Sequence, residues 1–79
     1  MTHSVVAELV GNVLVVNVHP GEHVAEGDTI VILESMKMEI PVLTEFRGVV
    51  RDVTVREGEV VQEGDVLAVI DTGAGPGPR

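Results

Sequence analysis

The chain has no cysteine, tryptophan or tyrosine, and Phe46 is its only phenylalanine among 79 residues. Without cysteine it forms neither disulfides nor thiolate metal sites, which is usual in a reducing cytoplasm, where we expect this protein. With so few aromatic rings it lacks the stacking surface that single-stranded nucleic acids use. No apolar run approaches the ~20 residues that span a bilayer, and no basic segment precedes an apolar stretch as in a secretory signal. We therefore expect neither a membrane nor a nucleic acid as partner.

Positive charge is also scarce. The chain has five Lys and Arg residues against thirteen Asp and Glu residues, which gives a formal net charge of −8. Such an acidic surface repels phosphate backbones and anionic lipids. Lys37 is the only lysine, and the other basic residues are arginines. Chemistry directed at a lysine amine therefore has one side-chain target, in addition to the amino terminus.

The length is that of one small domain with a modest core. We predict that this domain occupies residues 1–71 and that the protein is a monomer when free. Residues 72–79 are rich in glycine and proline and contain almost nothing apolar. This composition predicts a disordered tail, because it offers no apolar surface to bury.

Short runs rich in valine, separated by glycines and acidic residues, indicate an all-β domain. No segment keeps the apolar period of a helix. About eight short strands are expected, enough for a flattened barrel or a sandwich. The expected strands lie at residues 4–7, 12–18, around Val24, 29–35, 38–43, 49–55, around Val61, and 66–71. Turns between them are assigned to Gly21, Gly27, Gly58 and Gly64.

The chain contains an internal repeat. Residues 7–34 align without a gap on residues 44–71 at a shift of 37 positions, and eleven of the 28 aligned pairs are identical. Two copies predict two halves related by a pseudo-two-fold axis. In each copy the shared valines are spaced by three and then by two residues, which predicts a β-bulge in the longest strand. The expected core consists of Val13, Val16, Val18, Ile30, Ile32, Val50, Val53, Val55, Leu67 and Val69.

The segment that follows the first copy has no counterpart after the second. The register of the repeat places residues 35–39 where a strand must reverse into a hairpin, with Met36 and Lys37 at the turn. Two long side chains are unfavourable there, because tight hairpin turns favour Asn-Gly or Gly-X. Such a local conflict is typical of functional sites. The structural alternative is a strand lysine between two core methionines.

The sequence Glu34-Ser35-Met36-Lys37-Met38-Glu39 resembles the attachment motif of biotinyl domains, and the resemblance extends over residues 4–71. It implies a flattened barrel of two four-stranded antiparallel sheets, with biotin bound to Lys37 through an amide. It also implies attachment by a biotin protein ligase, and a non-catalytic carrier that moves CO₂ between biotin carboxylase and carboxyltransferase subunits. Within that family the chain resembles the stand-alone single-domain biotinylated proteins of actinobacteria and bacilli. The acceptor of the carboxyl group stays unassigned.

Three features depart from the usual pattern of that family. Ser35 stands where alanine is common, and Thr44-Glu45 stand where Ala-Pro is common. Only a tight turn separates Val18 from Val24, so the inserted thumb of some family members has no room.

The resemblance assigns recognition of partners to Met36 and Met38, unless these side chains merely pack back on the hairpin. Ser35 belongs to the same recognition segment, and Glu34 and Glu39 set the charge around the tip or simply solvate a strand edge. His3, His19 and His23 have no neighbours at zinc-ligand spacing, so we expect no metal site. Two rival functions remain open: a lipoyl carrier, which usually lacks the methionine after the lysine, and a non-carrier interaction module of the same fold.

Overall fold

The computed structural model describes residues 1–73 and contains eight strands in that range, as expected for an all-β domain. The strands are β1 (Thr2–Val6), β2 (Gly11–Val16), β3 (His23–Val24), β4 (Thr29–Ser35), β5 (Met38–Leu43), β6 (Gly48–Val53), β7 (Val60–Val61) and β8 (Val66–Asp71). Of the predicted tail, Thr72 donates its backbone N–H to the Met1 carbonyl and Gly73 donates to the Asp71 carboxylate. The other tail residues lie outside the described range.

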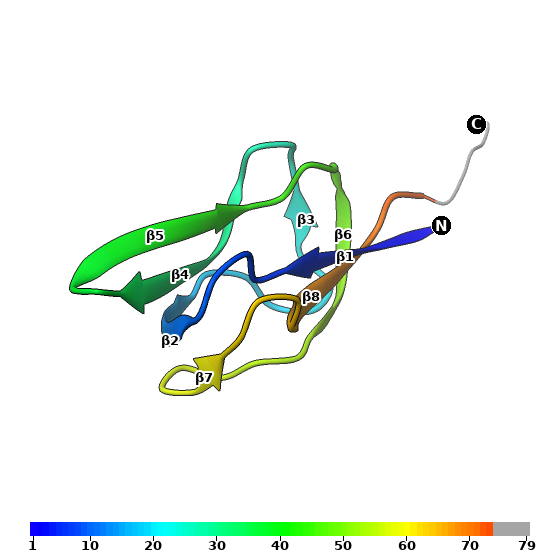
Figure 1. Cartoon of the computed structure of the whole chain (residues 1–79). Coiled ribbons are helices and arrows are strands. Elements are labelled where there is room, and N and C mark those ends of the chain that lie inside the picture. Colours follow the sequence, from blue (N-terminus) through cyan, green and yellow to red (C-terminus); the bar gives the residue numbers. More distant parts are fainter. Residues whose placement is uncertain (74–79) are drawn as a thin grey trace.

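The strands form two four-stranded antiparallel sheets, in the orders β1-β8-β6-β3 and β5-β4-β2-β7 (Figure 1). The described strands do not pair into a closed barrel, so the sandwich form of the prediction is the correct one. A shift of 37 residues relates β1 to β5 and β2 to β6, and likewise β3 to β7 and β4 to β8. Each sheet therefore maps strand by strand onto the other, which confirms the internal repeat.

Hydrogen bonds between the sheets follow the same symmetry. The backbone N–H of Gly21 donates to the carbonyl of Val50 at 2.7 Å, and the N–H of Gly58 donates to the carbonyl of Val13 at 2.8 Å. The glycines at all four predicted turns have φ between 91° and 94°, a left-handed conformation that costs little only for glycine. The turn between residues 18 and 24 is as tight as predicted.

The predicted bulges are present in both long strands. The pairing of β2 with β4 shifts register between Val13 and Val15, and that of β6 with β8 shifts between Val50 and Asp52. A second pair of register shifts was not predicted. In the pairing of β4 with β5, Ile30 is the extra residue between Thr29 and Val31. In the pairing of β8 with β1, Leu67 is the equivalent extra residue between Val66 and Ala68.

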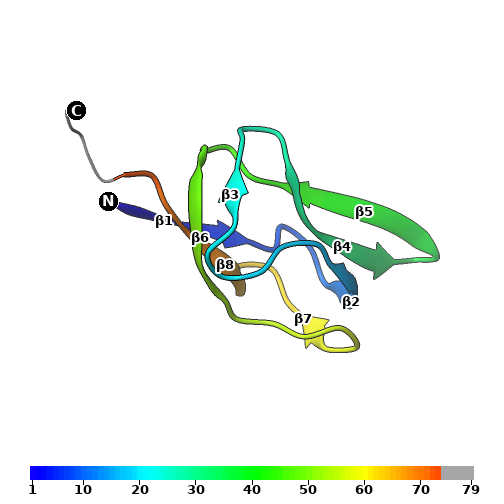
Figure 2. The ribbon, with the colours of Figure 1, turned by 180° about the vertical axis from the view of Figure 1, so that it is seen from behind.

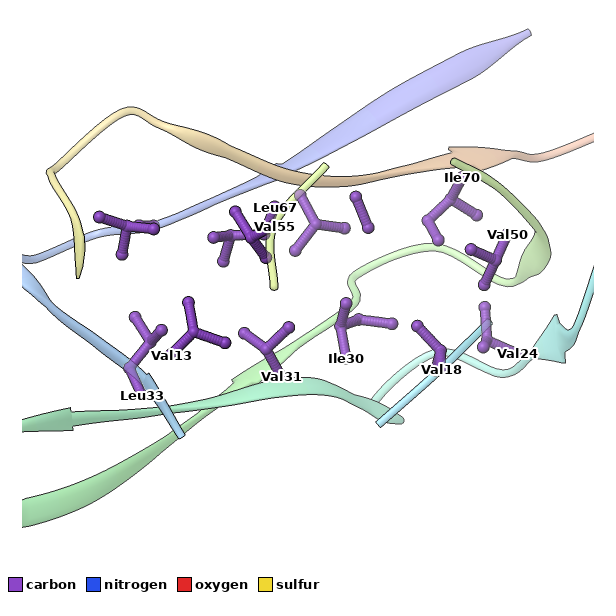
Figure 3. Packing of buried hydrophobic residues seen from close by; sticks show 14 residues of the cluster. Val13, Val18, Val24, Ile30, Val31, Leu33, Val50, Val55, Leu67 and Ile70 are labelled. Atoms are coloured by element: carbon purple, nitrogen blue, oxygen red, sulfur yellow. The ribbon is translucent and has the colours of Figure 1, made fainter. Parts of the chain in front are cut away.

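This second pair of bulges decides which residues form the core. Ile30 and Val31 are both buried, and so are Leu67 and Ala68, because the extra residue changes which face the next residue takes. The prediction that Ile32 and Val69 are core residues was wrong: both are half-buried, and Leu33 and Ile70 point inward instead. Val16 and Val53 pack only partly against the core. Figure 3 shows the side chains of β4 and β8 facing one another across the interior.

The hairpin of β4 and β5 and the two ends of the described chain, Met1 and Gly73, lie at opposite ends of the domain (Figures 1 and 2). Across the described residues no helix is present that is long and apolar enough to span a membrane. The sandwich thus presents one projecting element, the β4–β5 hairpin, far from both ends of the described chain.

Candidate functional site

The β4–β5 hairpin is anchored by its inner strand. β4 lies between β2 and β5 in its sheet, so it is hydrogen-bonded on both sides. Its side chains Val31 and Leu33 are fully buried. Glu34 is the last residue of β4 that pairs with both neighbours, opposite Asn12 of β2 and Glu39 of β5. Beyond this point only the two arms of the hairpin support each other, so a short tip projects from a rigid base.

The tip is a two-residue turn with unusual backbone geometry. Ser35 pairs with Met38, and the two residues between them have positive φ, 52° for Met36 and 65° for Lys37. No other non-glycine residue in the described part of the chain has positive φ. Two positive φ values match a type I′ hairpin turn, which suits the twist of the strands but is unfavourable for long side chains. The turn predicted from the register of the repeat is confirmed, and its unfavourable backbone conformation is shared by Met36 and Lys37.

The side chains of the tip are exposed. Met36 is 90% exposed and Met38 is 61% exposed, and Lys37 between them is exposed as well. The alternative of a strand lysine flanked by core methionines is therefore wrong. The ion pairs found within the described residues involve Met1, His19 and Arg51, and none involves Lys37. The lysine amine is therefore accessible to another protein without first breaking a salt bridge.

The remaining site residues give the tip its charge. Glu34 and Glu39 are exposed and lie directly opposite each other across the hairpin, whereas Ser35 is half-buried. Residues 34–39 have a net charge of −1, because they contain the two carboxylates of Glu34 and Glu39 and the single ammonium group of Lys37. Modification of the amine to an amide would remove the only positive charge of this segment.

Gly11 supports the base of the hairpin, a role that the sequence prediction missed. A Cβ atom at Gly11 would lie 2.9 Å from the carbonyl oxygen of Glu34, too close for β2 and β4 to keep their pairing. Its repeat mate Gly48 would meet the carbonyl oxygen of Asp71 in the same way. The signal was in the sequence, because this glycine is identical in both copies of the repeat.

Thr44, one of the three departures noted above, is well accommodated. Its side chain is 2% exposed, and its hydroxyl donates to the carbonyl of Phe46 at 2.8 Å and accepts from the N–H of Phe46 at 3.0 Å. Its backbone carbonyl accepts from the N–H of Gly27 at 2.8 Å. The loop after β5 therefore has a defined shape without proline.

The contacts of His3 and His19 are with residues outside the hairpin tip. His3 stacks on the ring of Phe46, and His19 lies 3.5 Å from the carboxylate of Glu22. His23 begins β3. In the range 1–73 no three His, Cys, Asp or Glu side chains gather in a way that could hold a metal ion.

The exposed lysine turn on a symmetric sandwich agrees with the comparison with known families. Residues 1–70 match the family model described as "biotin-requiring enzyme". The chain belongs to this family. Within it, a biotinylated protein TB7.3 homologue of Mycolicibacterium smegmatis is 63% identical over 43 residues, which is 54% of this chain and 61% of the relative. The chain thus aligns with about three fifths of the length of that relative.

Solved structures of larger enzymes and of carrier domains share the fold. The urea carboxylase of Kluyveromyces lactis contains a segment with a TM-score of 0.85 and 31% identity, covering 90% of this chain and 6% of the enzyme. The lipoyl domain of the 2-oxoglutarate dehydrogenase complex of Azotobacter vinelandii matches with a TM-score of 0.69 and 32% identity, covering 82% of each chain. These likenesses confirm the predicted fold. The family match and the biotinylated relative confirm the resemblance to the biotinyl family.

Proposed function

We propose that this protein is a biotin carboxyl carrier and that biotin is attached to the side-chain amine of Lys37 through an amide bond. The observation that carries this proposal is the position of the only lysine at the exposed tip of a strained two-residue turn. Strained backbone of this kind costs about 1–3 kcal/mol for each residue and persists where function requires it. Membership of a biotin-requiring family supplies the prosthetic group that such a lysine would hold.

The tip fits an attachment point. The lysine amine makes no ion pair within the described residues, and both neighbours in the sequence are exposed. An amine attacks an activated carboxyl group only after it has lost a proton. Glu34 and Glu39 lie near the turn, but within the described residues neither carboxylate forms an ion pair with this amine, so we assign its deprotonation to the protein that modifies it. We therefore assign the chemistry to a biotin protein ligase, and this chain is its substrate and no enzyme itself.

The flanking residues have roles in recognition. Met36 and Met38 present flexible apolar side chains that several partners can contact. Glu34 and Glu39 give the tip an acidic surround, and Ser35 allows close packing beside the turn. When bound, biotin carries a carboxyl group between two enzyme sites. The long arm on a projecting hairpin raises its effective concentration at both of them. We infer biotin carboxylase and carboxyltransferase subunits as these partners, in the cytoplasm, with the free protein as a monomer.

The test is biotinylation in a defined mixture. The protein is incubated with biotin, ATP and a biotin protein ligase, then probed with streptavidin and by intact mass. One biotinyl increment is expected, and Lys37→Ala and Lys37→Arg should remove it. Lys37→Ala should change the free energy of unfolding by no more than ~0.5 kcal/mol, because the side chain is exposed, so loss of labelling does not reflect unfolding. Labelling that persists in both variants contradicts the proposal.

A lipoyl carrier is the second candidate, favoured by the likeness to the lipoyl domain over 82% of both chains. Met38 directly after the lysine argues against it, since lipoyl domains usually lack a methionine there. A parallel reaction with a lipoate ligase and lipoic acid separates the two. A lipoyl increment in place of a biotinyl increment assigns the chain to lipoyl transfer.

A further inference from the structure

A groove of about 470 Å³ runs between β1 and β5, on the side of the sandwich where these strands form the outer edges of their sheets. The repeat relates β1 to β5, so the groove lies between two equivalent edges. Its apolar lining is partly exposed to solvent: Val6 is 37% exposed, Leu43 is 48% exposed and Phe46 is 38% exposed. These side chains are large and apolar, and burying them would be favourable.

Carboxylates surround this apolar lining. Glu8 and Glu45, which are equivalent in the repeat, lie on the two sides of the groove, and Glu26 adds a third carboxylate. All three residues are exposed, and no lysine or arginine lines the groove. Like charges focused along a cleft attract ligands of the opposite sign. The groove therefore combines apolar contact with negative charge, a combination that selects basic and apolar side chains together.

The groove is formed by fixed parts of the chain. Phe46 stacks on His3 with ring centroids 3.8 Å apart and an angle of 12° between the planes. The adjoining Thr44 is held by its hydroxyl contacts with Phe46 and by the backbone bond from Gly27. A site that is already ordered loses little conformational freedom when a ligand binds.

One continuous strand, β5, connects the groove with the hairpin tip. β5 begins at Met38, directly after Lys37, and its residues Ile40 and Leu43 line the groove. Figure 1 shows β5 running from the tip toward the middle of the domain, and residues of β5 line the groove together with residues of β1. A protein that holds the tip can therefore reach the groove from the same side.

We propose that this groove docks an extended segment rich in basic and apolar residues, supplied by the ligase that modifies Lys37. The inference rests on the proposed function and adds a second contact to it, remote from the turn. Charge complementarity selects this occupant. A second copy of the chain carries a net charge of −8 and an anionic lipid surface is also negative, so the carboxylates of the groove would disfavour both. The groove thus increases the affinity of the ligase for the unmodified carrier without contacting the reacting amine.

The first arm of the test measures binding without any reaction. Protein labelled with ¹⁵N is titrated with an alternating Lys-Val hexapeptide, with alternating Lys-Ser and Glu-Val hexapeptides as controls. Shift changes are expected in β1, in β5 and at Phe46 for the Lys-Val peptide alone. Glu8→Gln and Glu45→Gln should each weaken this binding at least threefold, and Leu43→Ser should do the same. Asp52→Asn, which removes an exposed carboxylate outside the groove, should change it less than 1.5-fold.

The second arm measures ligation of the same variants. We expect Glu8→Gln and Glu45→Gln to raise KM for the carrier at least threefold with kcat unchanged, whereas Asp52→Asn leaves both constants as in wild type. Equal effects of all three variants, or shift changes spread over the whole acidic surface, would mean nonspecific attraction and overturn the inference. Concentration-dependent sedimentation with shifts at the groove in the absence of peptide would assign it to a second copy and also overturn the inference.

The two proposals fail in different ways. If wild-type protein is not labelled at Lys37 by the ligase, the proposed function fails, whatever the titration shows. If labelling at Lys37 is normal and the groove variants keep the wild-type KM, the groove inference alone fails.

Discussion

Glu34 of β4 and Glu39 of β5 lie directly opposite each other, one residue pair before the turn that carries Lys37. Like charges in directly opposed positions destabilise a β-ladder by about 0.2–1 kcal/mol. Their placement beside the only lysine shows that the hairpin carries a cost in stability at the proposed attachment site. The carboxylates keep the tip acidic and well solvated once the lysine charge is lost.

Removal of one of these charges should therefore stabilise the fold. Glu39→Gln is expected to raise the free energy of unfolding by about 0.2–1 kcal/mol at low salt, because the repulsion disappears while the side chain keeps its length. The gain should shrink in 1 M salt, where exposed charges are screened within about 3 Å. Urea melts of wild type and Glu39→Gln at both salt concentrations measure this difference in the free energy of unfolding. Glu63→Gln, at an exposed turn position, serves as control; an equal gain there would show that the effect comes from net charge and not from the pair.

The turn itself should also be destabilising. Met36→Asn combined with Lys37→Gly gives the residue pair that a type I′ turn favours, so unfolding should cost about 1–2 kcal/mol more than in wild type. The same variant loses the lysine, so biotinylation should be abolished. Met36→Asn alone should give a smaller gain with the lysine retained. Thermal and urea unfolding of both variants measure the gain, and unchanged stability would mean that the turn is not strained.

Much of the fold could be predicted from the sequence, because the glycine turns and the internal repeat mark where the strands begin and end. The strands at residues 29–35, 38–43 and 66–71 have the predicted bounds, and the bulges of β2 and β6 followed from valine spacing. The inward face of β4 could not be predicted in the same way. The bulge at Ile30 lies in a continuous apolar run, where no polar residue marks the change of face.

The site was predictable for a related reason. Lys37 is the only lysine and stands where the repeat ends, so the sequence alone placed it in the hairpin turn, and its role as the attachment point stays a prediction. The support from Gly11 was not predicted, because the clash of a Cβ atom at this position with the Glu34 carbonyl oxygen depends on the pairing of β2 with β4. The groove between β1 and β5 was not predicted either, since its two sides come from different halves of the chain.

The corrected register of β4 gives a matched pair of core variants. Leu33→Ala should cost about 2–5 kcal/mol, because the side chain is fully buried and the change leaves a cavity. Ile32→Ala removes a similar volume from the adjacent, half-buried position and should cost only about 1–2 kcal/mol. Urea melts of the two variants provide the comparison. If Ile32→Ala proved the more destabilising, the inward face of β4 would be the one first predicted from the sequence.

Asp71 should make stability depend on acidic pH. Its carboxylate accepts hydrogen bonds from the N–H of Gly73 at 3.0 Å and from Arg51 at 2.9 Å, and the amino group of Met1 lies 3.6 Å away. The Gly73 hydrogen bond, the Met1 charge and Arg51 together lower the pKa of Asp71 below its ordinary value of 3.8, against a smaller opposing effect of desolvation.

Because this pKa is lowered on folding, the stabilisation is complete above the ordinary value of 3.8 and is lost as pH falls toward the lower folded value. Unfolding measured between pH 2 and 6 should show wild type more stable than Asp71→Asn at pH 6, with the difference narrowing below pH 3.8. A difference that stays constant across this range would mean that Asp71 acts through its shape and not through its charge.

The last prediction concerns Met36 and Met38, which are 90% and 61% exposed in the free protein. Met36→Leu keeps apolarity and volume, so its effect on ligation and carboxyl transfer should be modest. Met38→Gln keeps length but adds an amide that must lose water on docking, at a cost of about 1–2 kcal/mol. This cost corresponds to a roughly five- to thirty-fold fall in kcat/KM. Carboxyl transfer should suffer more than ligation, because the ligase needs chiefly a correctly placed amine.

Ligation kinetics, followed by turnover of the biotinylated variants with a carboxylase, measure both steps. Wild-type rates for Met38→Gln in both assays would show that Met38 takes no part in recognition and would contradict the role assigned to it.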